Sequence, residues 1–155
     1  MKESFKNAYL EDYQVGKIYK FGFVLVDKEE VISFAKKFDP QFFHIEETLA
    51  NSSQFKGIIA SGWHTCSMMM RLLVDNYISE CSSLGSPGVE KIRWTEPVRP
   101  GDILSLKVRV LQSRPSESKP DRGIVKSKIE MFNQKKVTVL EMETTGFFLS
   151  RKTSK

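Results

Sequence analysis

The stretch from Gly62 to Glu80 constrains the fold of this chain more than any other. One set of its apolar residues falls on a single stripe at helical spacing: Trp63, Cys66, Met70, Leu73, Val74 and Tyr77. A second set widens that stripe to most of the helix surface: Met68, Met69, Leu72 and Ile78. Because a helix that is apolar on most sides has to be buried, the sequence predicts a central helix that the rest of the chain encloses.

The chain after this helix is predicted to be β-structure. Apolar residues alternate with polar ones along 89–96, 104–110 and 125–131, and a last strand is expected over 137–149. An aromatic and β-branched segment at 19–26 predicts one more strand near the N-terminus. Alternation of this kind is typical of an antiparallel sheet with one solvated face. The predicted fold class is therefore α+β, an antiparallel sheet of about five strands wrapped around one long helix.

A second helix is predicted over residues 27–38. Asp27 and Glu30 form a D-x-x-E capping pattern, which satisfies unpaired N–H groups at a helix start. Four apolar residues then fall on one helical face: Val31, Phe34, Ala35 and Phe38. Pro40 disfavours helical backbone at the residue before it, so the helix is expected to end at Asp39.

The length and composition indicate one globular domain. The chain has 155 residues, which suits a single domain of ordinary size. Hydrophobic residues make up 40% and charged residues 28%, a balance that excludes a disordered chain. We therefore expect one domain over 1–155, with residues 1–16 as an N-terminal arm and 150–155 as a flexible tail.

Charge, hydropathy and cysteine content exclude several classes of protein. The net charge of +5 comes from scattered Lys and Arg residues, which indicates a solvated surface rather than a nucleic-acid site. No apolar run is long enough to cross a membrane, and no signal-peptide core is present at the N-terminus. Cys66 and Cys81 make neither a disulfide framework nor a C-x-x-C pair, so a reducing, cytoplasmic setting is expected, with Cys66 as a buried thiol. His44 and His64 lack companions at metal-ligand spacing, so no metal site is predicted.

Three residues near the middle of the chain carry groups suited to acid–base chemistry beside a carbonyl group. Asp39 supplies a carboxylate, and His44 supplies an imidazole five positions later, across the Pro40 turn. Gly62 begins the long helix, where a backbone N–H has no intrahelical acceptor and the helix dipole favours negative charge. Together these are the parts of a proton-transfer site with an oxyanion donor.

Each of these residues also has an ordinary structural interpretation. Asp39 before a proline is often a helix-ending residue. His44 among phenylalanines is compatible with a core histidine, and Gly62 with a packing glycine. His64 is interpreted as structural, because the sequence offers it no partner. Residue by residue, the structural interpretation of Asp39 is favoured.

Three longer motifs reverse that preference. They read F-D-P-Q-F-F-H-I-E at 38–46, I-A-S-G-W-H-T at 59–65 and R-W-T-E-P-V-R-P-G-D at 93–102. In residue identity, order and spacing these motifs closely resemble those of MaoC-like dehydratases, which are hot-dog-fold proteins of the R-specific enoyl-CoA hydratase superfamily. The motifs span most of the domain and are specific as a set, whereas each alone is weak.

The resemblance implies a fold, a substrate class and roles for four residues. It implies a hot-dog fold, a homodimer or higher oligomer, and acyl thioesters of coenzyme A or acyl carrier protein as substrates, with no cofactor. Asp39 and His44 are implied to be catalytic and to hold the water that adds to the double bond. The Gly62 N–H is implied to bind the thioester carbonyl, with Ser61 beside it in the substrate-binding motif. The implied reaction is that of a lyase of fatty acid metabolism, the reversible hydration of a trans-2-enoyl thioester to the (R)-3-hydroxyacyl thioester.

One departure from the family pattern lies in the first motif. R-specific hydratases usually read D-x-N-P-x-H, whereas this chain reads D-P-Q-F-F-H, without the asparagine but with the same spacing from Asp39 to His44. The departure bears on the substrate more than on the chemistry. Two other functions stay open on the same fold: a non-catalytic acyl-CoA-binding or regulatory protein, and a thioesterase. The presence of both Asp39 and His44 favours the enoyl thioester hydratase, and the carboxylate that a thioesterase needs elsewhere is not identifiable.

Overall fold

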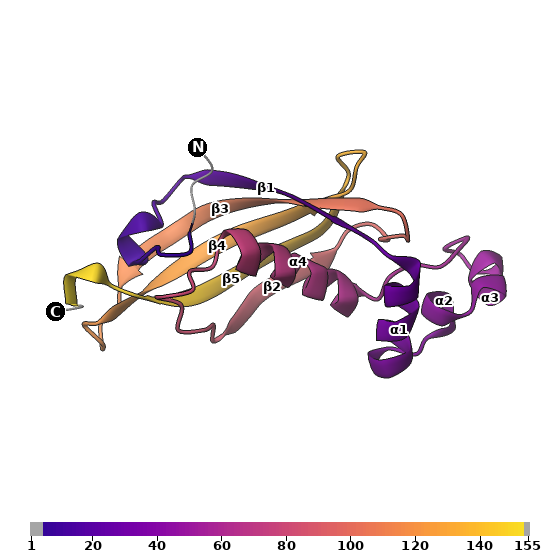
Figure 1. Cartoon of the computed structure of the whole chain (residues 1–155), viewed down its shortest axis with the longest axis horizontal. Coiled ribbons are helices and arrows are strands. Elements are labelled where there is room, and N and C mark those ends of the chain that lie inside the picture. The colour runs from indigo at the N-terminus through magenta and orange to yellow at the C-terminus, as the bar shows by residue number, and fades with distance from the viewer. Residues whose placement is uncertain (1–4, 154–155) are drawn as a thin grey trace.

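A five-stranded antiparallel sheet, in the order β1-β3-β4-β5-β2, forms the body of the part of the chain that the structure describes (Figure 1). The structure is a computed structural model and describes residues 5–153, except for the side chain of Thr153. The strands are β1 (Ile18–Leu25), β2 (Gly88–Trp94), β3 (Ile103–Pro115), β4 (Arg122–Phe132) and β5 (Thr138–Leu149). The predicted α+β class and antiparallel sheet are confirmed; β3 runs five residues further than expected, to Pro115, and the other strand ends lie within three residues of the expected ones.

The helices fall into two groups in space. The long helix α4 (Gly62–Asn76) lies along one face of the sheet, and the other α-helices gather beyond one end of it (Figure 1). That second group consists of α1 (Lys28–Phe38), α2 (Phe42–Ile45) and α3 (Glu47–Ser52). Two 3-10 turns, η1 (Leu10–Asp12) and η2 (Arg151–Thr153), lie near the two ends of the described chain.

The core lies between the sheet and α4. The inward residues of β3 are at most 2% exposed, as their alternation predicts: Leu104, Leu106, Val108 and Val110. The helix contributes four apolar residues that are also buried: Met68, Met69, Leu72 and Leu73. Burial of this apolar surface is the main force that holds the helix on the sheet.

The prediction for the surface of α4 was wrong on one side. The helix ends at Asn76 rather than Glu80, and three residues of the expected stripe are about half or more exposed, with Trp63 at 59%. Met70 and Val74 are the other two, and Cys66 is only half-buried. The reason is geometric: an open sheet covers one face of a helix, so the opposite apolar face stays uncovered within the described chain.

Helix α1 begins as predicted but buries fewer residues. The Asp27 carboxylate accepts a hydrogen bond from the Glu30 N–H at 2.8 Å, so the predicted cap is confirmed. Val31 and Ala35 are fully buried, whereas Phe38, the last residue of the helix, is 64% exposed. The helix ends at Asp39, directly before Pro40.

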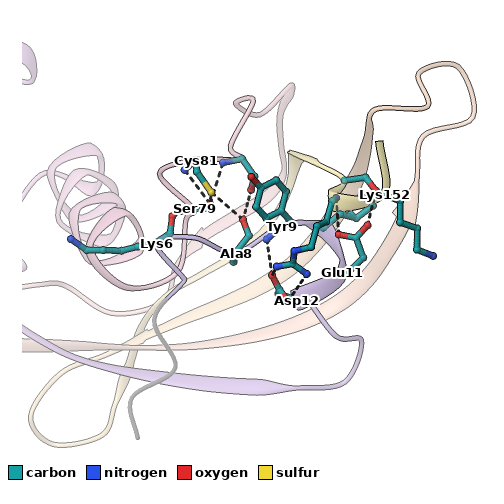
Figure 2. Close-up of polar contacts among 12 residues, drawn as sticks. Lys6, Ala8, Tyr9, Glu11, Asp12, Ser79, Cys81 and Lys152 are labelled. Carbon is teal, nitrogen blue, oxygen red and sulfur yellow. Dashed lines mark hydrogen bonds and ion pairs between the residues drawn. The ribbon is translucent and has the colours of Figure 1, made fainter. Parts of the chain in front are cut away.

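The two ends of the described chain pack against each other. Arg151 pairs with Asp12 at 2.6 Å, and Ser150 donates to Glu11 at 2.5 Å. Figure 2 shows these contacts beside those of Ser79 and Cys81 with the segment around Ala8. Residues 1–4 of the expected arm and 154–155 of the expected tail lie outside the described residues.

Candidate active site

The first feature of the site is the convergence of a carboxylate and an imidazole. Asp39 caps the end of α1, the chain turns at Pro40, and His44 follows on the short helix α2. This turn brings Asp39 Oδ2 to 3.3 Å from His44 Nε2. The structure therefore brings together the two residues that the sequence analysis singled out.

The His44 ring is fixed by a backbone contact on its far side. Its Nδ1 lies 2.7 Å from the carbonyl oxygen of Ile59, in a buried environment. We assign the hydrogen to Nδ1, because a carbonyl oxygen only accepts. In a neutral ring this tautomer leaves Nε2 as an acceptor that faces Asp39.

Asp39 is held by two further donors. The Ser61 hydroxyl donates to Oδ2 at 2.7 Å, and the Gln41 side-chain amide donates to Oδ1 at 2.8 Å. Burial raises the pKa of Asp39, but the hydrogen bonds from Ser61 and Gln41, together with the positive charge of His44 when its ring is protonated, outweigh it, so the pKa lies below the usual value of an aspartate. The carboxylate is therefore ionised at neutral pH.

Two acceptors that face each other create a place for a donor. The ionised Asp39 accepts only, and the assigned His44 tautomer presents a lone pair at Nε2. A water molecule carries two hydrogens and satisfies both groups at once. The pair is therefore suited to bind and polarise a single water.

The third predicted group belongs to Gly62, which lines the same pocket. Asp39, His44 and Gly62 all line a cavity of about 450 Å³, together with Trp63 and Trp94. Gly62 is the first residue of α4, and within residues 5–153 its N–H has no hydrogen-bond acceptor. A free N–H at a helix start favours a negatively charged oxygen.

The three motifs and the geometry that they build agree with one family of known proteins. The sequence model of the MaoC-like domain matches residues 14–131. The chain belongs to the MaoC-like domain family. The Bacillus subtilis (strain 168) protein YdeM, described as uncharacterized, is 31% identical over 134 residues, which cover 86% of this chain and 94% of that protein.

Solved structures of the family share the fold. A MaoC-like dehydratase from Rhodospirillum rubrum superposes with a TM-score of 0.86 at 36% identity, covering 93% of this chain and 98% of the other. The R-hydratase PhaJ1 from Pseudomonas aeruginosa gives 0.70 at 21% identity, covering 89% and 83%. The hot-dog fold and the MaoC-like resemblance expected from the motifs are therefore confirmed.

The structure places Ser61 next to Asp39, and its assignment to the substrate-binding motif stays a prediction. Its side chain is fully buried and does not line the cavity that holds Asp39 and His44. Instead the hydroxyl donates to Asp39 and accepts from the Trp63 N–H at 3.3 Å, as the cap of α4. Ser61 therefore ties the start of α4 to the carboxylate.

Ser61→Ala is expected to move the acidic limb of the pH profile of kcat/KM to higher pH. The hydroxyl stabilises the ionised form of Asp39, so its loss raises the pKa of that carboxyl. As the pH falls, the variant then loses its carboxylate earlier than the wild type does. The measurement is kcat/KM against pH, which reports the pKa values of the free enzyme.

Asp27→Ala is the matched control, because it also removes a helix cap, at α1. Both variants are expected to lose about 1 kcal/mol of stability, but only Ser61→Ala shifts the limb. An unshifted limb in Ser61→Ala would show that this hydroxyl does not tune Asp39.

Sequence reasoning missed two side chains of the site. Gln41 lies two positions after Asp39, where the usual motif has its asparagine, and its amide still reaches the carboxylate. The position of Gln41 in D-P-Q, two residues after Asp39, is the signal that could have identified it. Trp94, at the end of β2, covers Gly62 from a segment 32 residues away, and no local pattern predicts that contact.

His64 lies apart from the site. It is buried, its ring stacks on Phe34 with 4.7 Å between centroids, and its Nε2 is 3.3 Å from Glu30 Oε1. The structural interpretation of His64 is consistent with these contacts.

A second, more apolar cavity of about 570 Å³ runs between α4 and the sheet. Its walls include Met69, Leu73, Ile129 and Met142. Trp63 lines both cavities, so the apolar space adjoins the pocket of Asp39 and His44.

Two negative findings concern the described residues only. No helix among them is both long and apolar enough to cross a membrane. No three His, Cys, Asp or Glu side chains of residues 5–153 come together as a group that holds a metal ion.

Proposed function

We propose that this protein catalyses the reversible hydration of a trans-2-enoyl thioester, of coenzyme A or acyl carrier protein, to the (R)-3-hydroxyacyl thioester. The observation that carries the proposal is the 3.3 Å approach of Asp39 to His44 in one pocket with the free N–H of Gly62. Membership of the MaoC-like family and the shared fold of the R-hydratase support it.

The addition step follows from the two facing acceptors. A water that donates to both Asp39 and His44 from the pocket side attacks the β-carbon of the enoyl group, and one member of the pair takes its proton. The electron pair of the double bond moves toward the thioester carbonyl. A proton is then delivered to the α-carbon by the pair, so the elements of one water are added in total.

The Gly62 N–H stabilises the charge that develops on the thioester oxygen. A donor of this kind, already in position before the reaction, contributes roughly 3 kcal/mol to the transition state. The acyl chain then extends past Trp63 into the apolar cavity of about 570 Å³ along α4. The apolar walls of that cavity suit a hydrocarbon chain and offer little to a polar one.

The direct test mixes the purified protein with crotonyl-CoA and with longer enoyl thioesters. Loss of the enoyl absorbance and formation of the (R)-3-hydroxyacyl product are expected. Release of free thiol without hydration indicates a thioesterase instead. Saturable binding without turnover indicates an acyl-thioester-binding protein, and either result overturns the proposal.

We also propose that two copies associate through the open side of α4 and the edge strand β2. Trp63, Met70 and Val74 on α4, with Val89 and Trp94 on β2, are large apolar side chains that stay well exposed. Strand β2 pairs only with β5, so its other edge is free within the described chain. Apolar patches and free strand edges of this kind are usually covered.

Val74→Lys is expected to shift the protein from dimer to monomer at micromolar concentration. The lysine places a charge in the proposed contact, where it loses its hydration. Sedimentation velocity measures the change. Phe23→Lys, which replaces an exposed apolar residue of β1, is the control and is expected to stay dimeric. A wild-type protein that sediments as a stable monomer contradicts the dimer.

A further inference from the structure

The start of α4 is tied to the sheet by one side chain. Trp94 is the last residue of β2, and its indole Nε1–H donates to the carbonyl oxygen of Gly62 at 2.9 Å. Gly62 is the first residue of the helix, so this hydrogen bond joins the edge of the sheet to the helix start. No other side chain of the described residues donates to that carbonyl.

The same indole ring explains why residue 62 is a glycine. A Cβ at this position would lie 2.5 Å from Cε2 and 2.7 Å from Nε1 of Trp94, closer than real Cβ atoms approach other atoms. Gly62 is not among the glycines with positive φ, so its backbone conformation does not require glycine. The ring therefore lies directly on the Cα of Gly62.

Trp94 is itself held from two sides. Its backbone pairs with Leu140 in β5, next to the fully buried Val139. Its ring meets Trp63 in a T-shaped contact, with 5.2 Å between centroids and 79° between planes. The ring thus has a fixed position from which to restrain its neighbour.

The ring packed on the Gly62 Cα and the hydrogen bond to the Gly62 carbonyl oxygen together limit rotation about the two backbone bonds of that Cα, and so restrain the Gly62 N–H. The two groups are attached to the same Cα, and glycine has more backbone freedom than any other residue. A donor that is to stabilise a developing oxyanion has to be fixed before the reaction begins. We infer that Trp94 is a positioning residue that holds the Gly62 N–H in the direction needed for the thioester oxygen, an inference that rests on the proposed function.

The first test is Trp94→Phe, which keeps a ring over Gly62 but removes the indole N–H. A small displacement of a catalytic group costs up to about 10²-fold in rate. We therefore expect kcat to fall by about 10-fold to 10²-fold, with KM little changed, because the oxyanion develops only in the transition state.

Tyr13→Phe is the matched control. The Tyr13 hydroxyl donates to the carbonyl oxygen of Tyr77, at the other end of α4, also at 2.9 Å. Both variants lose one side-chain donor to a backbone carbonyl at an end of the same helix, so both lower the melting temperature. Only Trp94→Phe is expected to lower kcat. An unchanged kcat in Trp94→Phe, or an equal fall in Tyr13→Phe, overturns the inference.

The second test is a double-mutant cycle between Gly62→Ala and Trp94→Val. In the wild-type background the new methyl group collides with the indole ring, so Gly62→Ala is expected to lower both kcat and the melting temperature. In the Trp94→Val background the space is open, and both losses are expected to be smaller. Equal losses in the two backgrounds contradict the proposed restraint of Gly62 by Trp94.

The outcomes separate this inference from the proposed function. A wild-type protein that hydrates no enoyl thioester refutes the function and, with it, the role of Trp94. An active wild-type protein whose kcat is unaffected by Trp94→Phe refutes the role of Trp94 alone.

Discussion

Asp39→Asn is expected to lower the rate of enoyl thioester hydration by about 10²–10⁴-fold, the usual effect of removing a general acid or base. The substitution keeps the size of the side chain but removes its charge and half of its acceptor capacity. A neutral amide has one oxygen, so it cannot accept from Gln41 on one atom while a second atom accepts from Ser61 and from the attacking water. Initial rates with crotonyl-CoA, measured beside the wild type, check the result.

The fold and the binding of thioester are expected to survive this substitution. Asp39 is only partly buried, and the apolar cavity that we propose for the acyl chain lies on the far side of Trp63. Asp12→Asn is the control, because it makes the same substitution at the chain ends, where Asp12 pairs with Arg151 away from the pocket. Ordinary turnover by Asp39→Asn would refute the assignment of this carboxylate.

Those parts of the fold that depend on local pattern could be predicted from the sequence. Alternation along β3 predicts which side of the strand is buried, and its four inward residues are almost fully enclosed. The D-x-x-E pattern at Asp27 predicts the start of α1, and Pro40 predicts its end. Each of these patterns involves only a few neighbouring residues, so it can be recognised from the sequence alone.

The exposed face of α4 could not be predicted in the same way. The pattern of Trp63, Met70 and Val74 shows that this side of the helix is apolar, but not what covers it. In the described chain the sheet lies on the other side of the helix. An apolar helix surface is thus equally compatible with a buried core and with a contact to a second copy.

Only part of the site could be predicted from the sequence. Asp39 and His44 are close in the chain, and one turn brings them together. The groups that orient them are distant: Ile59 lies 15 residues from His44, and Ser61 lies 22 residues from Asp39. Helix α2, which carries His44, has four residues and is too short to show a helical period.

His44→Ala is expected to lower the hydration rate by about 10²–10⁴-fold as well, because the Nε2 acceptor for the water is lost. His64→Ala is a closely matched control. Both histidines are buried, and each has its Nε2 at 3.3 Å from a carboxylate oxygen, but His64 faces Glu30 away from the pocket. A general packing effect would lower the rate in both variants, whereas a catalytic role affects His44 alone.

The double variant Asp39→Asn/His44→Ala tests whether the two residues act on the same water. If both residues act on one water, removing either already removes the activated nucleophile, so the double variant is expected to be little slower than the slower single one. If the residues act independently, the two losses multiply to about 10⁴–10⁸-fold, since each alone is worth about 10²–10⁴-fold. Rates of all four proteins with the same enoyl thioester distinguish these outcomes. A multiplicative loss would mean that Asp39 and His44 act on different atoms, in spite of the 3.3 Å between them.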